Sequence, residues 1–216
     1  LGYSLIIPVM PFYMKNLGAG GKELGWLTAI YALTQTLCAP LWGVLSDRIG
    51  RKPILSIGML GYTISLLLFG LASSFWTLFI ARALSGVLSS ATSVASLAYV
   101  VDSSTEEERS KNMGQLGAAM SVGIMLGPLF GGILAGYSLA LPFFTGAGIS
   151  FIAFLLIVTV LPESIERSGY PHKKDSFDFL ALKSMLLGPA GVILILIFIV
   201  NFCQTGLQGI TGLYVV

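Results

Sequence analysis

Long apolar runs, each about as long as a lipid bilayer is thick, constrain this chain more than any other feature. A helix rises about 1.5 Å per residue, so about 20 apolar residues cross a hydrocarbon core of about 30 Å. The residues are 55% hydrophobic and only 10% charged, with a mean hydropathy of +0.88, whereas a soluble domain carries about 25% charged residues. Backbone polar groups in lipid must be satisfied within the segment, so we expect an all-α membrane protein.

Seven apolar segments can be read along the chain. They cover residues 1–17, 24–45, 53–73, 75–101, 113–137, 141–161 and about 185–216. We predict a six-helix transmembrane bundle over 1–162, an interdomain linker over 163–184 and a seventh transmembrane helix over 185–216. The chain begins without Met inside one apolar run and stops inside another, so we expect further chain beyond both ends.

The charges between the segments indicate an orientation. Lys and Arg follow the second, fourth and sixth segments, as Arg48, Arg51, Lys52, Arg109, Lys111, Arg167, Lys173, Lys174 and Lys183. The opposite side carries only Lys15 and Lys22. The positive-inside rule then predicts a multi-pass protein of the cell membrane with its N-terminus and the 163–184 linker in the cytoplasm.

Three motifs occur in order along the chain. The first, between the second and third segments, is Gly43-Val44-Leu45-Ser46-Asp47-Arg48-Ile49-Gly50-Arg51-Lys52. The second is Arg82-x-x-x-Gly86 in the fourth segment. An ionisable residue at that depth costs at least ~2.5 kcal/mol and should face the bundle or a wet cavity. The third is Gly123-x-x-x-Gly127-Pro128-x-x-Gly131-Gly132 in the fifth segment, where the glycines allow close helix contact and the proline should bend the helix.

These motifs resemble the signatures of the major facilitator superfamily, and the third resembles the one that marks its drug:proton antiporters. Pro8-x-x-Pro11 in the first segment is similar to a segment of the same exporters. The resemblance implies a major facilitator fold: a six-helix N-terminal bundle built as a 3+3 inverted repeat, followed by the first helix of a C-terminal bundle. It implies export of small apolar or cationic compounds in exchange for protons by alternating access.

The resemblance also implies roles for individual residues. By this resemblance, Arg51 would pair with Asp102. The residues that would act in gating and conformational coupling are Gly43, Asp47, Arg48, Gly50, Arg51, Lys52 and Asp102. Arg82 would tune proton coupling, although an arginine does not itself release a proton. The helix bend falls to Gly123, Gly127, Pro128, Gly131 and Gly132. Simpler interpretations stay open: a solvated surface ion pair, an arginine that clamps helix carbonyls, and glycines that only pack.

Candidate substrate contacts are Tyr31 and Gln35, four residues apart on one helix face, and Met120, one turn before the third motif. Aromatic and Met side chains suit varied apolar ligands, but all three could equally be packing residues. No Asp or Glu lies within the core of the apolar segments, so the titrating acid would be Asp47, Asp102 or a residue beyond this chain. Otherwise transport is not coupled to protons. The run Glu106-Glu107-Glu108-Arg109 is predicted to be a solvated loop.

Expected partners are a small-molecule substrate, protons and the bilayer, with no nucleic acid, and the transporter should work as a monomer. We expect no cofactor, because the proton gradient would supply the energy, and no metal site. The sequence contains no nucleophile–base pair or metal-ligand cluster, so we expect no enzyme. Two alternatives stay open: a carrier of a sugar or amino acid, and a non-transporting receptor on the same fold.

Overall fold

The computed structural model describes residues 2–6, 9–18, 20–164, 196 and 199. The seventh helix predicted over 185–216 and nearly all of the predicted linker lie outside these residues, as does Pro8. The described chain to residue 164 contains the helices α1 (Gly2–Ile6), α2 (Met10–Asn16), α3 (Gly21–Ile49), α4 (Arg51–Gly70), α5 (Phe75–Asp102), α6 (Glu106–Ala135) and α7 (Leu141–Val160). Among them, α3 to α7 are long and apolar enough to cross a membrane.

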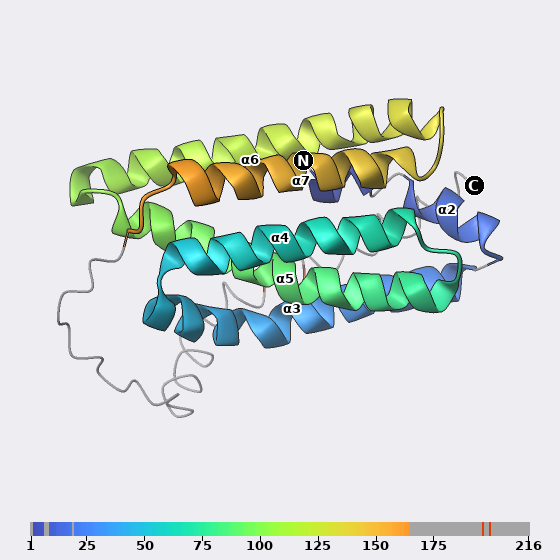
Figure 1. The fold of residues 1–216 in the computed structure, drawn as a ribbon, viewed down its shortest axis with the longest axis horizontal. Coiled ribbons are helices and arrows are strands. Elements are labelled where there is room, and N and C mark those ends of the chain that lie inside the picture. The colour runs from blue at the N-terminus through green and yellow to red at the C-terminus, as the bar shows by residue number, and fades with distance from the viewer. Residues whose placement is uncertain (1, 7–8, 19, 165–195, 197–198, 200–216) are drawn as a thin grey trace. The chain divides into compact units, whose positions relative to one another are not determined.

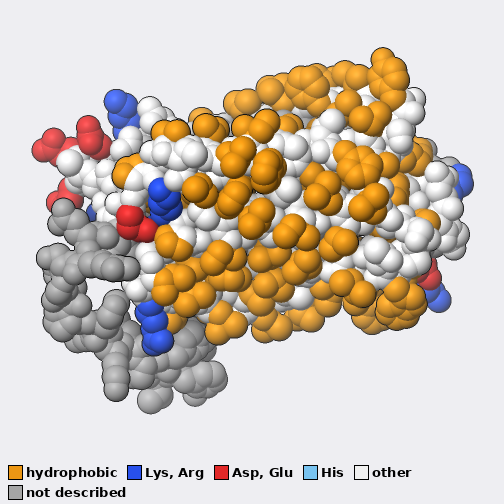
Figure 2. All heavy atoms as spheres, in the orientation of Figure 1, with side chains coloured by type: hydrophobic (Ala, Val, Ile, Leu, Met, Phe, Trp, Pro, Cys, Tyr) orange, Lys and Arg blue, Asp and Glu red, His pale blue; other side chains and the backbone are white. Residues whose placement is uncertain are grey.

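The long helices lie side by side (Figure 1). The α3–α4 turn, the α5–α6 turn and the C-terminal end of α7 share one end of the bundle, which we call the motif end. The α2–α3, α4–α5 and α6–α7 connections share the other end, which we call the far end. Figure 2 shows apolar side chains along the helices and Lys, Arg, Asp and Glu gathered at the two ends, as a bilayer requires.

The helix pairing follows the pattern of an inverted repeat. In such a repeat, the spans α1–α2, α3 and α4 correspond to α5, α6 and α7. If the two halves are related in this way, each helix contact in one half should have an equivalent in the other. The contact between α3 and α5 is then equivalent to the contact between α6 and α1, and the contact between α4 and α5 is equivalent to the contact between α7 and α1. The contact between α4 and α7 is its own equivalent. All of these pairs are in contact.

The first apolar segment forms two short helices, where the sequence predicted one span. The amide of Val9 donates to the carbonyl oxygen of Ile6 at 3.0 Å, where α1 ends and the chain enters α2. Pro11 then falls in the first turn of α2, where a missing amide hydrogen leaves no helical bond unmade.

The run 106–109 is the first turn of α6, so the prediction of a loop is wrong. Thr105 caps this helix, and its Oγ1 accepts the amide hydrogen of Glu108 at 3.3 Å. Three carboxylates at a helix N-terminus are favoured by the helix dipole. Their side chains are exposed, so the acids are solvated within a helix.

An aromatic core joins α2, α4 and α7 at the far end. Phe69 and Phe143 stack with their ring centroids 5.6 Å apart, and Tyr13 meets Phe143 edge-on at 5.3 Å. The Tyr13 hydroxyl donates to the carbonyl oxygen of Ala72 at 2.9 Å. This packing joins α2, α4 and α7 at the end of the bundle opposite the first motif.

Candidate functional site

The first motif forms a turn with almost no loop. α3 continues through Asp47 and Arg48 to Ile49, and α4 begins at Arg51. Gly50 alone separates the two helices, with φ of 111°, a conformation that glycine tolerates and other residues rarely adopt. The sequence placed Asp47 and Arg48 beyond the second apolar segment, whereas they form the last turn of its helix.

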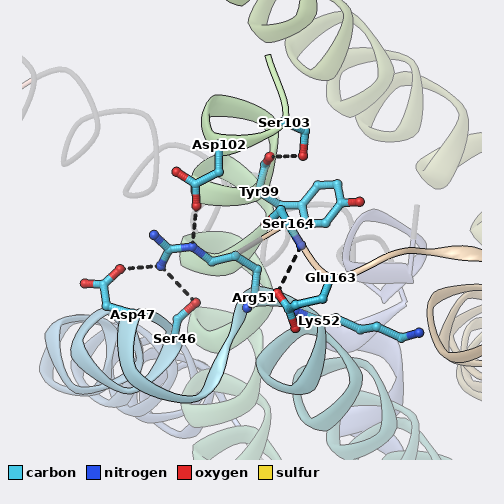
Figure 3. A network of polar contacts seen from close by, with 9 residues as sticks. All are labelled: Ser46, Asp47, Arg51, Lys52, Tyr99, Asp102, Ser103, Glu163 and Ser164. Atoms are coloured by element: carbon cyan, nitrogen blue, oxygen red, sulfur yellow. Dashed lines mark hydrogen bonds and ion pairs between the residues drawn. The ribbon is translucent and has the colours of Figure 1, made fainter. Parts of the chain in front are cut away.

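Arg51 is the centre of the charged network at the motif end (Figure 3). Its Nη1 lies 2.5 Å from Oδ1 of Asp47, and its Nε lies 2.7 Å from Oδ2 of Asp102. Nη1 also donates to Oγ of Ser46 at 3.2 Å. One guanidinium thus ties the α3–α4 turn to the last residue of α5, using the several donors that arginine presents in one plane.

Burial differs across this network. The side chain of Arg51 is 12% exposed and that of Asp102 is 31% exposed, whereas that of Asp47 is 55% exposed. Ser46 is fully buried, and the sequence analysis did not single it out. The Arg51–Asp102 pair is therefore the better shielded link, and Asp47 keeps much of its carboxylate available to another partner.

Glu163 is a member of the network that the sequence analysis missed. Its Oε1 accepts the amide hydrogens of Arg51 at 2.9 Å and Lys52 at 3.4 Å, so a carboxylate from the chain after α7 sits on the N-terminus of α4. The helix dipole favours a negative charge there. The hydroxyl of Tyr99 on α5 donates to the carbonyl oxygen of Pro162 at 3.1 Å and holds the same segment.

The structure shows fewer constraints on the other residues of the first motif that were predicted to act in gating, namely Gly43, Arg48 and Lys52. Gly43 faces α5, but a Cβ added there would meet Val94 at 3.7 Å, an ordinary contact, so this position does not require glycine on steric grounds. Arg48 is exposed and Lys52 is half-buried.

A second polar cluster lies inside the bundle, between α3 and α5. Arg82 is only 7% exposed, and its Cζ lies 4.4 Å from the centroid of the Tyr31 ring, a cation–π contact. The Tyr31 hydroxyl accepts hydrogen bonds from Gln35 Nε2 at 3.4 Å and from Ser89 Oγ at 3.1 Å. Arg82, which was predicted to tune proton coupling, therefore lies in the same cluster as Tyr31 and Gln35, which were predicted to contact the substrate.

Gly86 brings α3 and α5 close enough for this cluster to form. A Cβ added at Gly86 would lie 2.6 Å from the carbonyl oxygen of Tyr31 and would collide with Oγ1 of Thr34. Glycine in the second motif therefore has a steric role. Met120, the third predicted substrate contact, is 57% exposed on α6 and is not among the residues of this cluster.

The third motif packs against α1. Gly123, Gly127 and Gly131 are buried, and Ser4 donates its hydroxyl to the carbonyl oxygen of Gly123 at 2.7 Å. A Cβ at Gly127 would lie 2.5 Å from Cβ of Ser4, and one at Gly131 would meet the backbone of Leu5. Three glycines spaced by four residues thus form the surface on which α1 lies.

Gly132 and Pro128 belong to the same motif but lie on the exposed side of α6. A Cβ at Gly132 would meet nothing within 4 Å. The helix runs from Glu106 to Ala135 through Pro128, and the bend expected there stays a prediction. Among the described residues, no three His, Cys, Asp or Glu side chains are grouped to hold a metal ion.

Comparison with known proteins connects these features to a family. The family model of the Major Facilitator Superfamily matches residues 1–216. The chain belongs to this family. This family consists of transporters rather than enzymes, and the chain is a multi-pass membrane protein, as the sequence predicted.

Two relatives are drug-resistance proteins. "Multidrug resistance protein 2" of Bacillus subtilis is 36% identical over 218 residues, a match that covers 99% of this chain and 54% of that protein. "Quinolone resistance protein NorA" of Staphylococcus aureus is 30% identical over 207 residues, covering 95% of this chain and 53% of that protein. The chain spans about half the length of these curated relatives. The predicted relation to multidrug efflux proteins is confirmed.

Solved structures confirm the predicted fold. A bacterial homologue of the human lysosomal transporter Spinster, in an inward-facing and unoccupied conformation, gives a TM-score of 0.73 at 19% identity, over 87% of this chain and 46% of that one. The human organic anion transporter MFSD10 (TETRAN) gives 0.65 at 25% identity, over 76% of this chain and 45% of that one. The described helices correspond to the N-terminal half of such transporters.

Proposed function

We propose that the protein exports small apolar or cationic compounds across the cell membrane in exchange for protons, by alternating access. The observation that carries this proposal is the 36% identity to a multidrug resistance protein over 99% of the chain. The described bundle would act with a second bundle that begins at residues 185–216, after a linker over 163–184. One such two-bundle chain would suffice for transport, with substrate bound near the middle of the membrane between the bundles.

The motif end would be the cytoplasmic gate. Arg51, Asp102 and Glu163 hold the ends of α4, α5 and the segment after α7 in one arrangement. Asp47 is half exposed at the edge of this platform, so its carboxylate is available to a helix N-terminus of the second bundle. Gly50 permits the turn that presents it, and Arg48 and Lys52 add positive charge expected on the cytoplasmic side.

Arg82 would link substrate binding to proton movement. Among the described residues it is the charged side chain placed away from the helix ends. Because the guanidinium of arginine does not serve as a proton donor in proteins, Arg82 would act by changing the proton affinity of an acid or water near it. Asp47 and Asp102 at the motif end, or an acid of the second bundle, would carry the proton.

Export of organic anions is a second candidate. A buried arginine is a natural partner for a carboxylate or sulfonate substrate, and one structural neighbour of the chain is an organic anion transporter. Under this alternative, replacing Arg82 would weaken the binding of anions and leave the binding of cations unchanged or stronger.

The proposal can be tested in bacterial cells that lack their own drug pumps. Cells expressing the full-length protein are loaded with ethidium, and the loss of fluorescence is followed with and without a protonophore. We expect efflux that stops with the protonophore and is lost in the Arg82→Ala variant at equal membrane expression. Efflux that continues without a proton gradient would contradict proton coupling, and no efflux of any cationic dye would contradict the substrate class.

A further inference from the structure

The contact between Arg82 and Tyr31 joins two residues that were predicted to have separate roles, Arg82 in proton coupling and Tyr31 in substrate binding. The guanidinium lies 4.4 Å from the ring centroid, and the arginine is 7% exposed. An aromatic face attracts any cation within about 6 Å, including quaternary ligand cations. The Tyr31 ring therefore already carries, on one face, the kind of group that a cationic drug would present.

The ring is held in place from both of its ends. Its hydroxyl accepts hydrogen bonds from Gln35 one helical turn away and from Ser89 on α5. The backbone of Tyr31 is pressed against Gly86, one turn after Arg82. The ring thus has a fixed position between α3 and α5, whereas arginine has a long side chain with several rotamers.

We propose that the Tyr31 ring is a cation platform that Arg82 occupies in this structure, and that a lipophilic cationic substrate binds this platform by displacing the Arg82 guanidinium. This inference rests on the proposed function and names the site for its cationic substrates. Two positive charges about 4 Å apart repel each other strongly in a medium of low polarity, so the same ring face does not hold both.

Displacement would couple substrate to the Arg82 charge. When the substrate arrives, the guanidinium leaves the ring, and its field acts on other groups. By linkage, a condition that strengthens the contact between Arg82 and the ring by some factor weakens the binding of a cationic substrate by the same factor. Tyr31 is then both a substrate contact and a positioning residue for Arg82. This dual role explains why Tyr31 and Arg82 lie in one buried cluster.

The test is a double-mutant cycle on the purified full-length protein in detergent. Equilibrium dialysis measures binding of tetraphenylphosphonium, a lipophilic cation, and of triphenylphosphine oxide, an uncharged compound of related shape. The variants are R82Q, Y31L, Y31F, Y31L/R82Q and Y31F/R82Q, each checked for a monodisperse peak in gel filtration. R82Q should tighten tetraphenylphosphonium binding about ten-fold, because it removes the competing cation from the ring. It should leave the uncharged compound unchanged.

The ring must be necessary for this effect. Relative to Y31L, the Y31L/R82Q protein should gain less than about two-fold, whereas the gain should return between Y31F and Y31F/R82Q because phenylalanine keeps the aromatic face. Unchanged or weaker cation binding in R82Q would overturn the inference, and so would an equal gain in the Y31L background. Both results leave the proposed function standing. Folded wild-type protein that binds no tetraphenylphosphonium would overturn the inference together with the cationic substrate class.

Discussion

Replacing Gly131 with alanine tests the close packing of α1 on α6. The added Cβ would lie 3.1 Å from the carbonyl carbon of Leu5 and 3.2 Å from its Cα, and closer still to its carbonyl oxygen. These are backbone atoms that have no rotamer to change, so the helices must move apart. Overpacking of this kind costs about 1–3 kcal/mol, while alanine regains about 0.5–1 kcal/mol of helix propensity.

Gly132 provides the matched control on the same turn of α6. It lies at nearly the same membrane depth, and a Cβ there would meet nothing within 4 Å. Both variants gain the same helix propensity, so the difference between them isolates the contact with α1. We expect Gly131→Ala to be less stable than Gly132→Ala by about 1–3 kcal/mol, measured as the free energy of unfolding in mixed micelles of dodecyl maltoside and SDS. Equal stabilities, or a more stable Gly131 variant, would refute the packing argument.

Three further predictions concern the motif end and use the same unfolding measurement. Asp102→Asn should lower the free energy of unfolding by about 1–2 kcal/mol, because it breaks a partly buried ion pair between helices, whereas Asp47→Asn should lower it by at most about 0.5 kcal/mol. Equal losses would show that burial does not set the strength of these ion pairs. Glu163→Gln keeps an acceptor but removes the charge at the N-terminus of α4, at a cost of about 0.3–1 kcal/mol that high salt should reduce. A loss that salt leaves unchanged would exclude the dipole as its cause. Arg51→Lys should be less stable than wild type and should abolish the energetic coupling between positions 47 and 102, since one ammonium does not reproduce the arginine fork; coupling that survives would contradict a shared guanidinium.

The spans α3 to α7 were predictable because each is a long apolar run, and the fold could be expected from three motifs in the expected helices. The ends of the helices were less so. Hydropathy falls at Asp47, but α3 continues to Ile49, because a helix ends where the backbone turns and not where the bilayer ends. The acidic residues 106–108 were predicted to be a loop because charged residues are common in solvated loops. Thr105 followed by Glu108 three residues later is nevertheless a signal for the start of a helix.

The candidate site was predictable only where a motif carried it. The Arg51–Asp102 pair could be expected from the resemblance to the family. The contact of Glu163 with α4 joins residues 112 positions apart, and only its place directly after Pro162 at the end of the sixth apolar segment hinted at it. The Tyr31–Arg82 contact depends on how α3 and α5 are rotated against each other, which packing at Gly86 sets and no local pattern encodes.

Simultaneous measurement of dye flux and lumenal pH in proteoliposomes tests the central claim most directly. The full-length protein is reconstituted, ethidium is added, a pH gradient is imposed, and both signals are followed, with Arg82→Ala as the control. We predict that the dye moves against its concentration gradient while protons move the other way, and that both movements stop in the variant. Folded protein that moves neither dye nor protons when the gradient is imposed would contradict export by proton exchange.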